Sequence, residues 1–165
     1  MSDTAAGQRV IVTAGGSGIG RAIVDRFVAA GAQVHVCDVQ PDFLQEAIDS
    51  SDAVTGNLAD VGNPEDVENL VAQAVAQMGG VDVLVNNAAT TKPIPQHDLE
   101  AVTADEFHRL YAVNVVGNFQ MTRAAAPHLR ASGDGAVVNI SSIGAFLGNG
   151  SSIPYAVSKG ALNTL

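Results

Sequence analysis

The sequence predicts an α/β fold in which a doubly wound parallel sheet carries helices on both faces. Short apolar segments alternate with helical patterns five times along the 165 residues, and no repeat, linker or low-complexity tract interrupts them. The strand segments are largely apolar, as strands covered on both faces are. We therefore expect one domain over residues 1–165, with its ligand outside the carboxyl ends of the strands.

A glycine-dense turn separates the first strand from the first helix. Residues 10–12 form an apolar, β-branched run, the turn at 13–20 reads TAGGSGIG, and Gly31 ends the following helix. Amides at a helix N-terminus favour an anion, and glycines let a pyrophosphate approach the backbone. The turn alone leaves a ligand-free reading open. The apolar positions of this helix are Ile19, Ala22, Ile23, Phe27 and Ala30.

The next elements repeat this order. Asn63 as N-cap, Pro64 as first helical residue and glycines at 79–80 mark the ends of the clearest helix. The predicted elements are a strand at 33–38, a helix at 41–48, a strand at 53–55 with a turn at 56–60, the helix at 64–78 and a strand at 81–85.

The second half of the chain follows the same rhythm with longer loops. Two prolines indicate a surface loop at 90–101, and Thr103 with Glu106 forms a capping box for a long helix running towards Pro127. We then expect a fifth strand at 136–140 with Ser142 at its end, a flexible loop at 144–152 and a last helix opening near Tyr155.

Asp38 closes the second strand at the edge where the glycine turn lies. A carboxylate there accepts hydrogen bonds from both hydroxyls of an adenosine ribose and repels a 2′-phosphate. Because no Lys or Arg lies nearby in the sequence to pair with such a phosphate, the pattern favours NAD over NADP. A solvated aspartate at a strand end is the alternative.

Tyr155 and Lys159 stand one helical turn apart, so both side chains share a helix face. A phenol is a poor acid–base group at neutral pH because its ordinary pKa is about 10, and a nearby ammonium favours the phenolate. Surface decoration is the alternative. Ser142 ends the predicted fifth strand at the edge where Tyr155 also emerges, so its hydroxyl could polarise a substrate oxygen. Ser141 is its competitor, because neighbouring strand residues face opposite ways.

Asn114 is an amide on a helix face that otherwise looks buried. A buried amide needs partners. We expect Asn114 either to lock its helix to neighbouring backbone or to hold a water that relays protons to Lys159. The other members of that face are Phe107, Leu110, Tyr111, Asn118, Met121 and Ala125.

Composition excludes several classes of function. A net charge of −9 with eight scattered basic residues disfavours nucleic acid and anionic membranes as partners. The single cysteine, Cys37, fits a reducing compartment, and no signal or membrane-spanning run is present in the sequence, so we expect a cytoplasmic protein. Four histidines without paired spacing predict no metal site. The low share of charged residues, 15%, suggests a surface covered by a partner subunit.

The sequence resembles a short-chain dehydrogenase/reductase of the Rossmann type. The segment 13–20, Asp60, the run Asn86-Asn87-Ala88-Ala89, Asn114, Ser142 and YAVSK at 155–159 occur in the family's order and spacing. The resemblance implies an NAD-dependent oxidoreductase that interconverts a small-molecule secondary alcohol and a ketone by hydride transfer. It implies Asn114, Ser142, Tyr155 and Lys159 as catalytic residues, with Asn86 bracing the central strand. The implied coenzyme-binding residues are Thr13, Gly15, Ser17, Gly18, Ile19, Gly20, Asp38, Asp60, Asn87, Ala88, Tyr155 and Lys159.

The sequence departs from the family pattern at three points. Ala14 and Ala89 replace glycines, and the sequence stops at Leu165, whereas family members continue through two more strands and a segment covering the substrate. The resemblance thus implies a C-terminally truncated domain with five strands present, and a homo-oligomer, dimer or tetramer, in the complete form. The alternatives are a dinucleotide-binding fragment with weak or no turnover, and a regulatory partner of a full-length relative.

Overall fold

The computed structural model describes residues 5–165 and contains one parallel sheet with the strand order β3-β2-β1-β4-β5. Because β4 lies on the side of β1 opposite to β2, the strand order reverses between β1 and β4. Such a reversal defines the switch point of a doubly wound sheet, and it confirms the predicted fold class. The strands are β1 (Arg9–Thr13), β2 (Gln33–Asp38), β3 (Val54–Leu58), β4 (Val83–Asn86) and β5 (Ala136–Asn139).

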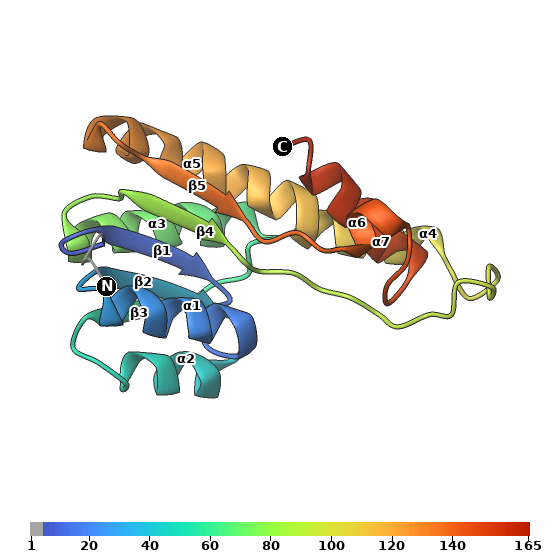
Figure 1. The fold of residues 1–165 in the computed structure, drawn as a ribbon, viewed down its shortest axis with the longest axis horizontal. Coiled ribbons are helices and arrows are strands. Elements are labelled where there is room, and N and C mark those ends of the chain that lie inside the picture. The colour runs from blue at the N-terminus through green and yellow to red at the C-terminus, as the bar shows by residue number, and fades with distance from the viewer. Residues whose placement is uncertain (1–4) are drawn as a thin grey trace.

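Helices cover both faces of this sheet (Figure 1). On one face lie α1 (Gly18–Ala29) and α2 (Pro41–Ile48), and on the other lie α3 (Pro64–Met78) and α5 (Asn118–Ser132). The remaining helical elements extend beyond the carboxyl ends of the strands, where Figure 1 shows them past the arrowheads. They are α4 (Ala104–Tyr111), the π-helical segment η1 (Ala112–Gly117), α6 (Gly144–Leu147) and α7 (Ile153–Leu162).

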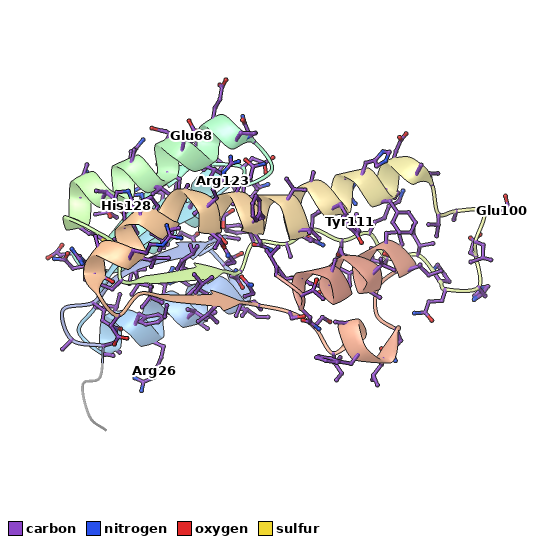
Figure 2. The ribbon with its side chains drawn as sticks, turned by 90° about the horizontal axis from the view of Figure 1, so that it is seen from above. Arg26, Glu68, Glu100, Tyr111, Arg123 and His128 are labelled. Carbon is purple, nitrogen blue, oxygen red and sulfur yellow. The ribbon has the colours of Figure 1, made fainter. Side chains whose placement is uncertain are left out.

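Alternating strand residues divide the apolar interior into two cores. Val10 and Val12 pack towards α1 and α2, whereas Ile11 between them packs towards α3 and α5. Figure 2 shows the two helical layers from above, with Arg26 of α1 and Glu68 of α3 on opposite sides of the sheet. The sheet is therefore buried on both faces at β1, which explains why its sequence is a continuous apolar run.

Several predicted boundaries were wrong. Strand β3 continues to Leu58, because residues 56–58 pair with the end of β2 instead of turning away. The long helix runs through Pro127 to Ser132, since the packed face of α5 compensates for one missing backbone bond. The segment expected to be a flexible loop at 144–152 contains α6, and β5 ends at Asn139, three residues before Ser142.

The apolar face expected for α1 is only partly covered. Ile19 is 66% exposed, and with Phe27 of α1 and Val138 of β5 it lines a groove of about 620 Å³. This groove lies beside β5, the edge strand, whose residues Ala136–Val138 are exposed. No helix within residues 5–165 combines the length and the apolar character that crossing a membrane requires.

An ion pair joins the start of β1 to the segment before β4. The Arg9 Nη2 atom lies 2.6 Å from Asp82 Oδ1, and Nε donates to Oδ2 at 2.9 Å. The backbone N–H of Arg9 also donates to Asp82 Oδ2. The hydrogen bond from the Arg9 side chain holds the pKa of Asp82 below its ordinary value. The pair is bidentate and half-buried, the geometry in which an ion pair contributes to stability.

We expect Asp82→Asn to lower the free energy of unfolding by about 1 kcal/mol at neutral pH, because it removes a charge-assisted bidentate pair. A lowered pKa in the folded state stabilises the protein above the ordinary pKa, and that stability disappears as the pH falls through the lowered value. The difference between wild type and variant should therefore shrink in acid, as measured by urea unfolding. Asp25→Asn, which breaks the exposed pair with Arg21, is the control and should cost less. An equal cost in both variants would contradict the assignment.

Candidate active site

The loops after β1 and β4 are fastened to each other at the carboxyl edge of the sheet. The buried Thr13 hydroxyl accepts hydrogen bonds from the backbone amides of Asn87 (3.0 Å) and Ala88 (2.9 Å). The Asn87 side chain donates in return to the carbonyls of Thr13 and Ala14. Thr13 and Asn87, both predicted to bind coenzyme, thus use their side chains to close the loop that would surround it.

Glycines in the turn are required by close contacts. A Cβ on Gly20 would collide with the Ala14 carbonyl and lie 2.6 Å from Asn87 Nδ2, and one on Gly16 would lie 2.8 Å from Asp38 Oδ2. Ala14, which stands where the family has glycine, adopts the left-handed conformation with φ 51°. A side chain is strained there, so this departure has a cost in backbone energy.

Asp38 lines a cavity of about 340 Å³. The residue is 7% exposed, and its carboxylate accepts hydrogen bonds from the backbone amides of Gly16 (3.2 Å) and Gln40 (3.0 Å). The structure thus contradicts the alternative of a solvated strand-end aspartate. Two backbone donors fix the carboxylate and leave lone pairs for ribose hydroxyls. The cavity is lined by Ala14, Cys37, Asp38, Val39, Ala59, Asp60, Val61, Ala88, Ala89, Thr90, Arg109 and Val113.

The other predicted coenzyme residues of the turn lie outside this cavity. Gly15 is buried against Val36, whereas Ser17, Gly18 and Ile19 are exposed at the N-terminus of α1. The side chain of the N-cap residue Ser17 makes no capping hydrogen bond, so its hydroxyl does not compete for the first amides of the helix. An anion therefore has access to that helix end.

The two candidate serines separate clearly in their contacts. Ser141 donates from Oγ to Asn163 Oδ1 at 2.6 Å, and its hydroxyl also lies 3.4 Å from the Lys159 carbonyl. Ser142 instead accepts at Oγ from the Gly144 amide (3.1 Å). Because a hydroxyl has one proton to donate, Ser141 uses its proton within the protein, on Asn163 just after α7, whereas the Ser142 hydroxyl retains a proton that it can donate.

Tyr155 and Lys159 both lie on α7, which begins two residues earlier than predicted. Ser152 is its N-cap and accepts from the Tyr155 amide. Lys159 is 2% exposed, and its Nζ donates to the Ile140 carbonyl at 2.7 Å, which excludes surface decoration. Burial lowers the pKa of the Lys159 ammonium. Tyr155 is half-buried, and its ring lies beside Gly150.

Asn114 connects the loop after β4 to α7. Its Oδ1 accepts from the Thr90 amide (2.8 Å), and its Nδ2 donates to the Thr90 carbonyl (3.0 Å) and to Ser158 Oγ (3.0 Å). Ser158 in turn donates to the Tyr155 carbonyl. The side chain of Asn114 is therefore fully used in holding backbone and helix together, which favours the structural one of its two predicted roles.

Thr90, Ser152 and Ser158 are positioning residues that sequence reasoning did not identify. A serine two residues before Pro154 was a usable signal for the N-cap. Ser158 and Thr90 gave no signal, because each acts through Asn114, distant in sequence. Among residues 5–165 no cluster of three metal-ligating side chains occurs, and His35 is occupied by hydrogen bonds to Thr55 and Asn57.

Known proteins match this chain over almost its whole length. The short chain dehydrogenase family model matches residues 8–165. An L-fucose dehydrogenase from Bos taurus is 39% identical over 165 residues, which are 100% of this chain and 60% of that protein. The chain spans about 60% of the length of the curated relatives it matches.

Two solved structures share the fold closely. A 3-ketoacyl-(acyl-carrier-protein) reductase from Brucella melitensis, complexed with NADH, superimposes with a TM-score of 0.91 at 31% identity, covering 98% of this chain and 68% of that one. An NAD⁺-bound xylitol dehydrogenase gives a TM-score of 0.90 at 26% identity, covering 98% of this chain and 63% of that one.

The conformation of Ala14 yields a stability prediction. Ala14→Gly should raise the free energy of unfolding by up to about 1 kcal/mol, because glycine adopts positive φ without strain, although it also gains entropy in the unfolded chain. Thermal unfolding measures the change. Ala22→Gly, an exposed site inside α1, is the control and should lose stability. Destabilisation by Ala14→Gly of the same size as the control would refute the strain at this position.

Proposed function

The chain belongs to the short-chain dehydrogenase/reductase family, and we propose that it interconverts a secondary alcohol and a ketone with NAD as coenzyme. One observation carries the proposal. A buried lysine and a tyrosine share a helix at the same edge of the sheet as a cavity bounded by a buried carboxylate. The substrate would lie between the loop at 90–95 and the segment at 143–153.

The residues present fit a dinucleotide. Gly18 borders open space, because no atom of the described residues, its own helix and chain neighbours aside, lies within 4 Å of the point where its Cβ would be, and the open N-terminus of α1 can accept a pyrophosphate. Asp38 faces the cavity as an acceptor for two ribose hydroxyls, and its charge opposes the 2′-phosphate of NADP. Asp60 and Ala88 line the space left for adenosine. NAD, when bound, supplies or accepts the hydride.

The residues of the chain donate the proton to the substrate oxygen and hold the reacting groups in position. In the reduction direction Tyr155 donates its phenolic proton to the carbonyl oxygen, and the free hydroxyl proton of Ser142 stabilises that oxygen. The Lys159 ammonium favours the phenolate that Tyr155 becomes. Asn114 joins Thr90 to α7 and so holds in place the helix that carries Tyr155.

We also propose that the protein acts in the cytoplasm as a homo-oligomer. Large apolar side chains are exposed on η1, α5 and α7, among them Val116, Phe119 and Val157. Such side chains favour contact with another subunit. Cys37 is a buried free thiol whose pKa is raised to about 12 by burial, as suits a reducing compartment.

The coenzyme preference is tested at Asp38. Asp38→Ala should weaken NAD binding by about 10-fold or more, because hydrogen bonds to a charged group are lost, and should weaken NADP binding much less. Calorimetric titration of both coenzymes measures the effect. Asp25→Ala, an exposed aspartate of α1, is the control. An unchanged preference would mean that Asp38 does not select the coenzyme.

The proton donor is tested at Tyr155. Tyr155→Phe should lower turnover by at least about 100-fold while coenzyme affinity stays nearly constant, because only the proton-transfer group is removed. The sequence has a second tyrosine, Tyr111, and Tyr111→Phe is the matched control. Steady-state rates with polyols, steroids and keto-acyl thioesters, together with coenzyme titration, give the answer. Activity retained in Tyr155→Phe would mean that another group donates the proton.

A further inference from the structure

The loop between α6 and α7 carries the one Asn-Gly dipeptide in the sequence, Asn149–Gly150. Both residues are exposed. Within residues 5–165, neither the side-chain amide of Asn149 nor the backbone N–H of Gly150 takes part in a hydrogen bond. The two groups that react in asparagine deamidation are therefore both unengaged and open to water.

The chemistry requires only these two residues and water. The Gly150 nitrogen attacks Cγ of Asn149, a new C–N bond forms, the bond from Cγ to Nδ2 breaks, and ammonia leaves a succinimide. Water then opens either carbonyl of the ring and gives aspartate or isoaspartate. The sum is one amide and one water giving a carboxylate and an ammonium ion, with no oxidation. Glycine assists because no Cβ shields its nitrogen and its backbone is unrestricted.

The same loop touches both residues proposed to handle the substrate oxygen. The Asn149 carbonyl packs so tightly on Gly144 that no Cβ fits there, and the Gly144 amide holds Ser142 Oγ. A Cβ on Gly150 would lie 3.7 Å from the Tyr155 ring. Isoaspartate lengthens the backbone at position 149, so it moves the carbonyl that covers Gly144.

We propose that Asn149–Gly150 is a site of spontaneous deamidation, and that its conversion disturbs the positions of Ser142 and Tyr155. The deamidation itself follows from exposure and sequence alone, whereas its effect on turnover rests on the proposed function. The charge and the backbone length at position 149 would therefore change with the age of the protein, next to the segment proposed to hold the substrate.

The deamidation is tested by mass. The chain is incubated in mildly alkaline buffer, digested and mapped at intervals, and Asn149 should gain one dalton ahead of Asn69 and Asn63. Asn69 is exposed on α3 but precedes Leu70, and Asn63 precedes Pro64, which has no N–H. Asn149→Gln should stop the conversion, because the longer side chain closes a less favourable ring. Retention of the amide at Asn149 for as long as at Asn69 would overturn the proposal.

The effect on the site is tested without relying on activity. Hydrogen exchange of residues 142–150 should accelerate as isoaspartate accumulates, and should stay constant in Asn149→Gln. Where turnover is measurable, wild type should lose it several-fold in parallel with conversion, whereas Asn149→Gln should keep its own starting rate, whatever its value, over the same incubation. Conversion with unchanged exchange and unchanged turnover would refute the coupling to the site, and a protein without turnover would still yield the mass and exchange results.

Discussion

One buried hydroxyl holds the binding edge of this sheet together. Thr13 ends β1, and its Oγ1 satisfies two backbone amides of the loop that follows β4. Within the described residues the Ala88 amide has no other backbone partner and the Asn87 amide has only the Val85 carbonyl, and an unsatisfied buried amide costs about 1–3 kcal/mol. The clamp fixes the glycine turn against the β4 loop, and Ala14 of the turn and Ala88 of the loop both line the cavity beside Asp38.

Local signals in the sequence were sufficient for much of the fold. Asn63 caps α3 as predicted, accepting from the Glu65 amide, and Gly79 ends that helix in the left-handed conformation. The Thr103 half of the capping box also forms, but the Glu106 carboxylate pairs with Lys92 and Arg109 instead of closing it. Charges brought near by folding compete with the local partner, and no short sequence window contains them all.

The remaining differences arise from long-range pairing and from small shifts of phase. Residues 56–58 have no strong preference for a strand, and they form one because β2 offers free backbone partners. The π-helical segment around Asn114 changes the number of residues per turn within the long helix. The spacing of apolar residues did not predict this change, since Leu110, Met121 and Ala125 are buried on either side of the segment. At the site, spacing alone left Lys159 and the two serines undecided. Burial and hydrogen bonding distinguish them, because both depend on the segment from Ile140 to Ser142 folding back on α7.

The strand order also has a consequence for how the protein acquires its shape during synthesis. β1, β2 and β3 are neighbours made in succession, so this half of the sheet can assemble with α1 and α2 as soon as residue 58 has left the ribosome. β4 must then return to the opposite side of β1, and the Thr13 hydroxyl receives its partners only after Ala88 has emerged. Until that moment the glycine turn of the growing polypeptide has no β4 loop to pack against, and the cavity beside Asp38 lacks the wall that Ala88 provides.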